Sequence, residues 1–559
     1  MYSNKKIVQS LGEILKAKSI FNIIISPGSR NAPIIIHFTQ HKDFKTYSIV
    51  DERCAGFFAL GIAQQIRKPV VISCTSGSAV VNYYPAIIEA FYQRIPLILV
   101  TADRPKEIVD VFEGQSIHQE NIFQKHVETS IQLTEDESES GIWYNDRLMN
   151  QSINKCILKN KPIHINIPFS EPLYNTINHL QVKPKIIKTI PIKNYIKTYN
   201  YKKEQYIWKK CKKKMILLGL YYPEKKNMEK ILRKLSLNPS IVIFTETTSH
   251  VYGKSFFSNI DQLIFNMNPK KWISLKPHIL LTIGINIISK KIKYFLRKYP
   301  PIYHWHIGKH YENYPDTYYK LTTYWDINPE SFFQIFDNYT IPFSDYREKW
   351  DKLKREKKKK HKFFLKKEKS FSDLKVLFFV FKAIPNNTIL QLGNSMIVRY
   401  YQLFDEKKYS IKSYCNRGTS GIEGSVSTAV GSSVTKKTVT LIIGDISFFY
   451  DSNALWNNYI PKNFRIILIN NGGGNIFRFI SEKELPEKIF NFFETKHILS
   501  AEKICEMHHW KYEKVSNQNA LKNSLSSFWE KSNKPFLLEI NTQKSNNAQI
   551  LKKYLSYLS

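Results

Sequence analysis

Short apolar runs rich in β-branched residues alternate with segments of helical pattern along most of the chain. In the first third, such runs occupy 22–25, 46–50, 69–74 and 96–100, and a further run lies within 161–174. Each run is followed by small or polar residues. This alternation predicts strand–helix units that build a parallel sheet. Because parallel strands end at the same edge of a sheet, the polar residues after the runs are expected to line one binding edge.

The same alternation continues to the end of the chain. Over 185–345 the apolar runs are MILLGLYY, SIVIFTET and HILLTIGIN, and later runs lie at 387–391, 438–443 and 464–469, with PFLLEIN near the end. A length of 559 residues suits three domains. We therefore expect an α/β protein with three doubly wound parallel-sheet domains, at 1–180, 185–345 and 371–559, with a basic linker at 346–370. The third domain is expected to mirror the first.

The stretch 438–477 carries the most informative polar residues. The run at 438–443 ends in Gly444-Asp445, and the run at 464–469 ends in Asn470-Asn471 and three glycines. The residues between the runs, 446–463, are enough for the helical crossover that parallel strands require. Asp445 and Asn471 should therefore meet at the edge of the sheet.

A carboxylate, an amide oxygen and a main-chain carbonyl from the glycine turn form an oxygen donor set that suits Mg²⁺. The alternative is an aspartate that caps a helix and an Asn-Gly turn without a ligand. The occurrence of both halves at the ends of two strands favours the metal site. Eight of the 20 glycines fall within 418–474, which also indicates that this segment binds a ligand.

The formal net charge is +36 and the isoelectric point is about 9.6, which raises nucleic acid or an anionic membrane as a partner. Lysine, isoleucine and asparagine are abundant over the whole chain, so we interpret the charge as a compositional bias. The basic run 349–369 is expected to be a solvated linker helix, and a nucleic-acid-binding segment is the alternative. We expect no nucleic-acid partner.

The six cysteines include no C-x-x-C pair, so neither a disulfide framework nor a zinc site is expected, and a reducing cytoplasm fits. The first residues contain no signal-peptide core. The longest uncharged stretch, 69–88, is rich in Ser, Thr, Gly and Asn. We expect no membrane span.

The Gly-Asp pair followed by Asn-Asn resembles the diphosphate-and-metal motif of thiamine-diphosphate enzymes. The resemblance implies that Asp445, Asn471 and the carbonyl of Gly473 hold Mg²⁺ or Mn²⁺. Ile446 stands where that superfamily often has glycine. Glu52 lies in the first turn of a predicted helix, where a favourable interaction with the helix dipole would explain it. The resemblance instead implies that a buried Glu52 protonates N1′ of the thiamine-diphosphate aminopyrimidine.

Glu52 and Asp445 belong to different predicted domains. The superfamily resemblance implies that these domains meet across a subunit interface. The protein is therefore expected to be a homodimer or homotetramer with active sites at the interface.

A closer resemblance rests on motifs that occur in order from 26 to 477. They are SPGSRNAPI, DERCAGFFALGIA, CTSGSAVVNYYPAIIEA, PLILVTADRP, KPIHINIPFSEPLY, GNSMIVR, NRGTSGIEGSVSTAVG, GDIS and NNGGGNIF. They resemble the 2-succinyl-5-enolpyruvyl-6-hydroxy-3-cyclohexene-1-carboxylate synthases of menaquinone biosynthesis. The resemblance implies decarboxylation of 2-oxoglutarate and addition of the succinyl-semialdehyde carbanion to isochorismate. The alternative is another thiamine-diphosphate-dependent 2-oxoacid decarboxylase or carboligase.

Both implied substrates are dicarboxylates, so the site should carry several fixed cations. By motif match, the resemblance assigns catalysis to Glu52, Arg30, Arg399 and Arg417. It assigns cofactor binding to Glu52, Ser29, Thr75, Gly77, Ile422, Gly444, Asp445, Ile446, Ser447, Asn471 and Gly473. It assigns substrate binding to Ser29, Arg30, Arg104, Gln115, Lys290, Lys291, Ser395, Arg399 and Arg417.

Two departures from the family pattern bear on the substrate side of the site. Gly114 stands before Gln115, where the family more often has a larger residue. The spacing from Asp445 to Asn471 is also slightly short.

Overall fold

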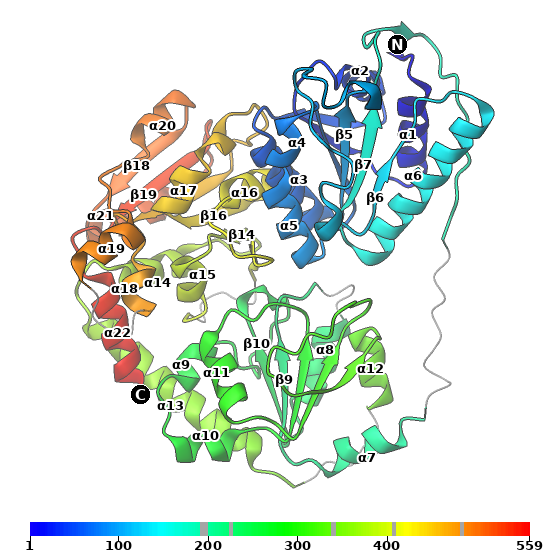
Figure 1. Ribbon diagram of the computed structural model, residues 1–559. Coiled ribbons are helices and arrows are strands. Elements are labelled where there is room, and N and C mark those ends of the chain that lie inside the picture. The colour runs from blue at the N-terminus through cyan, green and yellow to red at the C-terminus, as the bar shows by residue number, and fades with distance from the viewer. Residues whose placement is uncertain (190–199, 223–226, 337–342, 405–409, 436, 481–485) are drawn as a thin grey trace.

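A computed structural model describes residues 1–189, 200–222, 227–336, 343–404, 410–435, 437–480 and 486–559. Three parallel sheets, each covered by helices, form the molecule (Figure 1). The first sheet lies at the upper right of this view, the second below, and the third at the left. The expected fold class of three doubly wound parallel sheets is confirmed.

The first sheet contains β2 (Asn22–Ile25), β3 (Lys45–Ser48), β4 (Val70–Cys74), β5 (Leu97–Asp103), β6 (Ser130–Gln132) and β7 (Ile163–Pro168). Its order is β3-β2-β4-β5-β7-β6, and all pairs are parallel. The five runs identified in the sequence are strands here. The short β6 was missed because its three residues, SIQ, contain a single apolar side chain.

The third sheet contains β14 (Ile389–Leu392), β15 (Lys412–Cys415), β16 (Val439–Gly444), β17 (Arg465–Asn470), β18 (Lys511–Val515) and β19 (Phe536–Asn541). Its order is β15-β14-β16-β17-β19-β18. Counted from the first strand of each sheet, this is the same order as in the first sheet. The expected mirror relation between the two domains is confirmed.

The middle sheet contains β9 (Lys214–Leu218), β10 (Ile241–Thr245), β11 (Ile279–Ile283), β12 (Tyr303–Ile307) and β13 (Leu321–Trp325), in the order β10-β9-β11-β12-β13. The sequence analysis missed β12 and β13, whose sequences YHWHI and LTTYW interrupt the apolar pattern with His and Thr. β1 (Tyr2–Ser3) and β8 (Thr176–Ile177) form a separate antiparallel pair.

Helices cover both faces of each sheet. The first domain has α1 (Lys6–Ala17), α2 (Ala32–Gln40), α3 (Glu52–Ile66), α4 (Ser78–Asn82), α5 (Tyr84–Gln93) and α6 (Glu139–Lys159). The middle domain has α7 (Lys202–Lys210), α8 (Asn227–Leu235), α9 (Ile260–Ile264), α10 (Pro269–Leu275), α11 (Lys290–Lys298) and α12 (Pro329–Ile335). α13 (Tyr346–Lys367) connects the middle and third domains.

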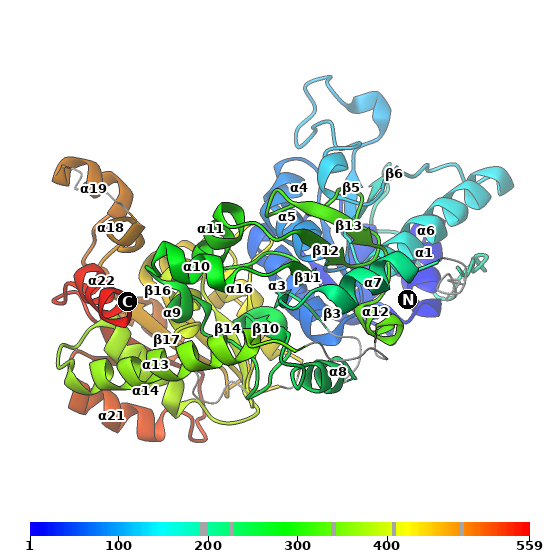
Figure 2. The ribbon, with the colours of Figure 1, turned by 90° about the horizontal axis from the view of Figure 1, so that it is seen from below.

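The third domain has α14 (Asp373–Ala383), α15 (Met396–Tyr401), α16 (Ser425–Ser433), α17 (Asp445–Tyr450), α18 (Ile476–Ile480), α19 (Glu487–Glu494), α20 (Glu502–Met507), α21 (Gln518–Ser527) and α22 (Asn547–Leu558). α18 and α19 project from the body of this domain (Figure 2). The predicted crossover between β16 and β17 contains the short α17 and a 3₁₀ turn, Ser452–Leu455.

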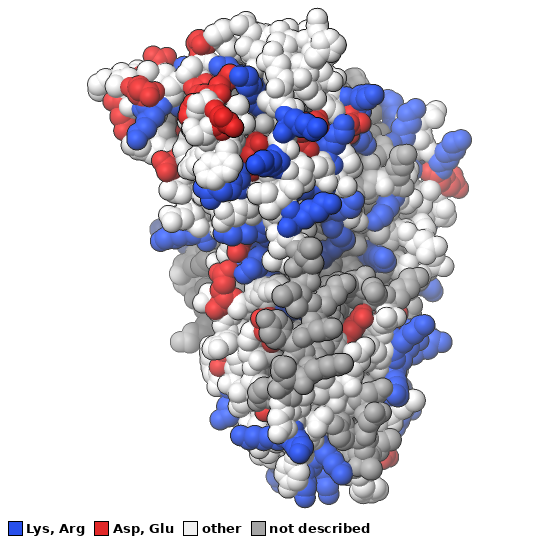
Figure 3. Space-filling model, turned by 90° about the vertical axis from the view of Figure 1, so that its right-hand side faces the viewer, with Lys and Arg blue, Asp and Glu red and all other residues white. Residues whose placement is uncertain are grey.

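The basic run forms α13, but this helix is not solvated on all sides. Trp350, Leu353 and Phe364 are buried on one face, and the ammonium group of Lys357 donates to the carbonyls of Leu558 and Ser559. The expectation of a solvated linker is therefore wrong for this face, because its apolar residues recur at helical spacing among the lysines. On the face of the molecule in Figure 3, Lys and Arg are spread over many elements rather than gathered in one patch.

The first and third domains contact each other where α3 crosses α16, and glycines allow the close approach. A Cβ on Gly61 would lie 2.1 Å from the carbonyl oxygen of Thr428, and one on Gly431 would lie 1.9 Å from that of Phe58. Gly424, at φ +73°, leaves room for the ring of Phe57. Gly424 and Gly431 therefore serve packing between the domains, although the glycine-rich segment to which they belong was expected to bind a ligand.

Within the described ranges, no helix combines the length and the apolar character that crossing a membrane requires.

Replacing Gly431 with alanine should destabilise the protein, because the added Cβ would collide with the backbone of α3. We expect the free energy of unfolding to fall by about 1–3 kcal/mol, the usual cost of overpacking. Chemical denaturation followed by tryptophan fluorescence measures this change. Gly114→Ala is the matched control, since a Cβ at Gly114 meets nothing within 4 Å. Equal stability of the two variants would contradict the prediction.

Candidate active site

Asp445 links the ends of two neighbouring strands. It follows β16, and its Oδ2 accepts hydrogen bonds from the backbone N–H groups of Asn471, Gly472 and Gly473 at 3.1, 2.8 and 3.0 Å. Its Oδ1 accepts from the N–H of Ile446 at 2.8 Å. The carboxylate therefore shapes the turn after β17, and the two halves of the predicted motif meet at the edge of the sheet.

Oxygen atoms suited to a cation remain in this turn. Oδ1 of Asn471 is buried without a hydrogen-bond partner, while its Nδ2 donates to Asp373 at 2.8 Å. The carbonyl of Gly473 accepts one hydrogen bond, from the N–H of Asn475 at 2.9 Å. Gly472 and Gly473 adopt φ values of +79° and +146°, which favour glycine. The residues present thus fit a divalent cation with few protein ligands.

The metal set contains a single carboxylate. In the described part of the chain, no group of three or more His, Cys, Asp or Glu side chains is arranged to hold a metal ion. Mg²⁺ commonly takes one or two carboxylates and completes its coordination with water and substrate phosphate. A site of this kind is therefore compatible with Asp445 and two neutral oxygens.

Space for a ligand lies beside the same turn. A Cβ on Gly444 would meet no atom within 4 Å, so the backbone there is open to a bound group. Ile446 is half-buried and Ser447 is buried in the first turn of α17. His497 also lies beside Asp445, with its Nε2 3.4 Å from Oδ2 of the carboxylate.

Glu52 begins α3 at the carboxyl edge of the first sheet. It is half-buried, and its Oε2 accepts a hydrogen bond from Nδ2 of Asn82 at 3.1 Å. Asp51 caps the helix by accepting from the N–H of Cys54. Thr75 and Gly77 follow β4 at the same edge, and the Oγ1 of Thr75 is buried without a partner. This edge therefore offers a carboxylate and an unpaired hydroxyl.

Arg30 and Arg104 lie close together at that edge. Nη1 of Arg30 donates to the carbonyl of Phe169 at 2.7 Å and lies 3.3 Å from Glu171. Burial, followed by the neighbouring charge of Arg104, lowers the pKa of Arg30. Arg104 donates to the carbonyl of Gly114 at 2.9 Å, next to the predicted Gln115. The structure thus brings these sequence-predicted residues together.

Arg399 and Arg417 form a second pair of cations, where the third domain faces the middle domain. Arg399 is on α15 and donates to the carbonyl of Ile288, and Nη1 of Arg417 donates to Oδ1 of Asn394 at 3.1 Å. Burial, followed by the charge of Arg417, lowers the pKa of Arg399. Among the described residues, neither guanidinium forms a salt bridge, and the Nε of each is buried without a partner.

The predicted lysines lie at the start of α11 in the middle domain. Lys290 and Lys291 are exposed at the start of α11, and Lys291 lies over the ring of Phe265. Lys293, which sequence reasoning missed, is half-buried. Burial lowers its pKa, and the charges of Arg417 and Arg399 act in the same direction. Lys293 therefore lies within electrostatic reach of both Arg399 and Arg417.

The remaining predicted residues lie on loops or at helix starts. Ser29 and Gln115 are exposed, and Ser395, at φ +67°, is half-buried just before α15. Ile422 is 37 % exposed in the loop before α16. An exposed isoleucine among glycines is consistent with an apolar contact to a ligand.

Sequence reasoning also missed buried carboxylates near the site. Glu246 follows β10 and accepts from the N–H groups of Ile288 and Ser289 at 2.6 and 2.8 Å. Its position after an apolar run was the signal that could have identified it. Burial raises the pKa of Asp373 to about 6. Asp373 looks like an ordinary helix start in the sequence, so no signal pointed to it.

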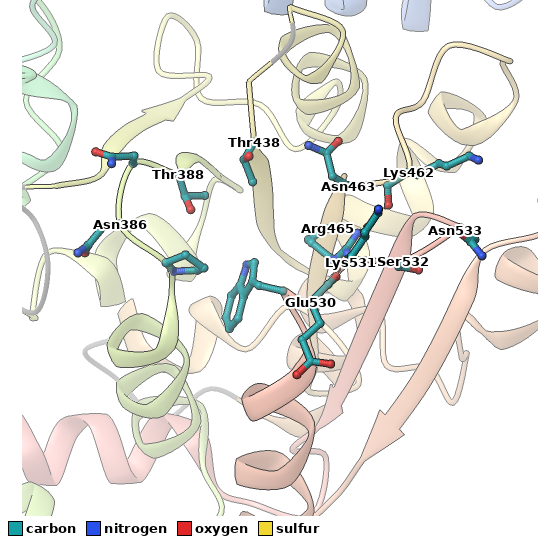
Figure 4. A pocket seen from close by; sticks show the side chains of 13 residues that line it. Asn386, Thr388, Thr438, Lys462, Asn463, Arg465, Glu530, Lys531, Ser532 and Asn533 are labelled. Carbon is teal, nitrogen blue, oxygen red and sulfur yellow. Dashed lines mark hydrogen bonds between the residues drawn. The ribbon is translucent and has the colours of Figure 1, made fainter.

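A cavity lies at the opposite edge of the third sheet. It has a volume of about 750 Å³, and Thr388, Thr438 and Arg465 line it where β14, β16 and β17 begin (Figure 4). The guanidinium of Arg465 donates to four backbone carbonyls, so its charge supports the fold. This cavity is separate from the Asp445 edge.

Comparison with known proteins identifies the family. Residues 5–129 match the thiamine pyrophosphate enzyme, N-terminal TPP binding domain. The chain is 46 % identical to the 2-succinyl-5-enolpyruvyl-6-hydroxy-3-cyclohexene-1-carboxylate synthase of Flavobacterium johnsoniae, over 100 % of both chains. It is 43 % identical to that of Christiangramia forsetii, over 100 % of this chain and 99 % of the relative, and 35 % identical to that of Bacteroides thetaiotaomicron, over 100 % of both.

The chain belongs to the 2-succinyl-5-enolpyruvyl-6-hydroxy-3-cyclohexene-1-carboxylate synthase family. The family resemblance found in the sequence is therefore confirmed, and so is the thiamine-diphosphate-binding fold.

Mg²⁺ added together with thiamine diphosphate should raise the melting temperature, because a ligand that binds only the folded state stabilises it. Asp445→Ala should abolish this rise, since the substitution removes a carboxylate donor and frees the turn at 471–473. Differential scanning fluorimetry measures both effects. Asp451→Asn is the control, because Asp451 is a buried carboxylate that binds Ser427 rather than this turn. A full rise in Asp445→Ala would show that Asp445 is not needed for binding.

Proposed function

We propose that the protein is a thiamine-diphosphate-dependent enzyme that decarboxylates 2-oxoglutarate and adds the resulting four-carbon unit to isochorismate. The products are 2-succinyl-5-enolpyruvyl-6-hydroxy-3-cyclohexene-1-carboxylate and CO₂, and the reaction belongs to menaquinone biosynthesis. Full-length identity to synthases of that name supports this function. Within the structure, the main support for this function is the Arg399–Arg417 pair. Both side chains are part-buried, and neither forms a salt bridge among the described residues, so both are available to a carboxylate substrate.

Thiamine diphosphate, when bound, supplies the electron sink that decarboxylation of a 2-oxoacid requires. The carboxyl group of Glu52 would hold the proton at N1′ of the aminopyrimidine. Its position on the carboxyl edge of the first sheet, the edge that also carries the unpaired hydroxyl of Thr75, supports this role. Ile422 would contact the cofactor through its exposed side chain.

We propose that Asp445, Asn471 and the carbonyl of Gly473 bind the divalent cation that holds the diphosphate. The unpaired Oδ1 of Asn471 supports this assignment. The donor set suits Mg²⁺ and Mn²⁺ alike, since both accept oxygen ligands. Gly444 leaves the open backbone that a diphosphate would approach.

The two arginine pairs would bind the carboxylates of the two substrates. Arg399 and Arg417 lie in the third domain, whereas Arg30 and Arg104 lie in the first. In each pair the pKa of one guanidinium, that of Arg30 or of Arg399, is lowered by burial and then by the positive charge of its partner. An anionic ligand would offset that positive charge. Ser395, Gln115 and Lys293 border these pairs and are candidates for further contacts.

We infer a homodimer or homotetramer in which two chains complete each site. Glu52 and Asp445 lie in different domains, and the hydrogen bond that Glu52 forms is to Asn82 of its own domain. The loop that carries Gln115 also presents Val111 and Phe112, which are strongly exposed. Such side chains suit contact with a second copy of the chain.

A different decarboxylase or carboligase of the same superfamily would share the cofactor site but would not need isochorismate. A coupled omission assay separates the two functions. Protein, thiamine diphosphate, Mg²⁺ and 2-oxoglutarate are mixed with or without isochorismate, while CO₂ release and isochorismate absorbance are followed. We expect equal loss of both substrates only when all components are present. Release of CO₂ without consumption of isochorismate would favour the alternative.

Glu52→Gln should retain the fold and lose most of the turnover, because glutamine cannot exchange a proton with N1′. General acid–base groups typically contribute about 10²–10⁴-fold to the rate, and a loss in that range is expected. Steady-state kinetics with both substrates measure the effect, and circular dichroism checks the fold. Glu107→Gln serves as the control, because Glu107 is exposed on the surface of the same domain. Near-normal turnover of Glu52→Gln would remove Glu52 from the mechanism.

A further inference from the structure

The side-chain amide of Asn471 can present either of two chemically opposite ends to the proposed cation. Its oxygen would coordinate a metal, whereas its NH₂ group would direct partial positive charge at it. The two orientations have nearly the same shape, so packing alone selects poorly between them. A neighbouring group must therefore fix whether the oxygen or the NH₂ group of Asn471 faces the cation.

Asp373 is the neighbouring residue that can fix this orientation. Its Oδ2 accepts a hydrogen bond from Nδ2 of Asn471 at 2.8 Å, although the two residues lie 98 positions apart in the sequence. An ionised carboxylate can only accept hydrogen bonds, so it pairs with the NH₂ end and repels the oxygen. Oδ1 of Asn471 is then the end without a partner, as the structure shows.

Asp373 is itself held in place from two sides. Its Oδ1 accepts from the hydroxyl of Thr542 at 2.5 Å, and its backbone N–H donates to Oδ1 of Asn547 at 2.8 Å. The N–H of Thr542 in turn donates to the carbonyl of Asn470, at the end of β17. With 3 % of its surface exposed, Asp373 has little freedom to turn away.

We propose that Asp373 is a positioning residue that fixes the carboxamide of Asn471 with its oxygen toward the cation. This inference rests on the proposed metal site, and it assigns Asp373 no contact with the cation or the substrates. Partners behind a metal ligand commonly orient it in this way, and their loss typically weakens metal binding by about 10–100-fold.

Metal affinity measured without substrates tests the proposal. Mn²⁺ binding in the presence of thiamine diphosphate is followed by electron paramagnetic resonance, and Mg²⁺ binding by titration calorimetry. Asp373→Ala should raise both dissociation constants by about 10–100-fold. Asp373→Asn keeps an oxygen that can accept from Asn471, so its affinity should stay close to that of the unchanged chain. Melting curves confirm that each variant is folded.

A reversed pair gives a second, independent readout. Asn471→Asp alone places two carboxylates against each other and should bind metal weakly. Adding Asp373→Asn supplies an NH₂ donor on the other side of the contact, so the double variant should recover affinity relative to Asn471→Asp. Asp451→Asn is the matched control, a buried carboxylate of the same domain for which no change in metal affinity is expected.

Three results would overturn the proposal. They are unchanged affinity in Asp373→Ala, a loss in Asp373→Asn as large as in Asp373→Ala, and absence of metal binding by the unchanged chain. The second result would assign the effect to the charge of Asp373 rather than to orientation. If the unchanged chain binds metal but fails the omission assay, the proposed reaction falls while the role of Asp373 stands.

Discussion

The contact on which the candidate site depends is the one between the carboxylate of Asp445 and three successive N–H groups after β17. Hydrogen bonds to an ionised acceptor are stronger than neutral ones, and here three of them converge on a single oxygen atom. They hold the glycine turn in a conformation with positive φ angles that other residues rarely adopt. The same turn leaves the amide oxygen of Asn471 and the carbonyl of Gly473 available. One side chain thus organises the backbone and also offers an oxygen ligand.

The candidate ligand-binding residues are divided between two sheets of the same topology. The first and third sheets have the same strand order, and each ends in a polar edge. The edge of the third sheet offers oxygen donors and the Arg399–Arg417 pair, whereas that of the first offers Glu52 and the Arg30–Arg104 pair. The middle domain contributes through the loop and helix after β11. The carbonyl of Ile288 accepts a hydrogen bond from Arg399, and Lys293 lies within electrostatic reach of Arg399 and Arg417.

The sequence allowed prediction of those parts of the fold that follow from local pattern. Strands that are buried on both faces, such as β4, β16 and β17, read as largely apolar runs and were located within a residue or two. β12 and β18 were missed because YHWHI and KYEKV contain polar residues whose packing depends on distant neighbours. The two-strand geometry around Asp445 could be predicted because the ends of parallel strands must share an edge.

The rest of the site depends on contacts that no local pattern records. Asp373, at the start of α14, contacts Asn471 in the turn after β17. Nothing in the sequence around Asp373 distinguishes it from a residue at any helix start. Lys293 feels the charges of Arg399 and Arg417, but its place in a run of lysines gave no sign of this in the sequence. Gly424, just before α16, and Gly431, within it, resembled ligand-binding positions in the sequence, but their small size serves the crossing with α3.

That crossing has a consequence for how the molecule can open. In shear motions, packed helices slide past each other on a layer of side chains. At the glycines of α3 and α16 the backbones touch directly, so we do not expect these two helices to slide past each other. The first and third domains should move as one rigid body within a chain. Relative motion of these two domains within one chain is therefore not expected to open the Asp445 edge. The same close contact leaves no room for a larger residue at Gly61 or Gly431.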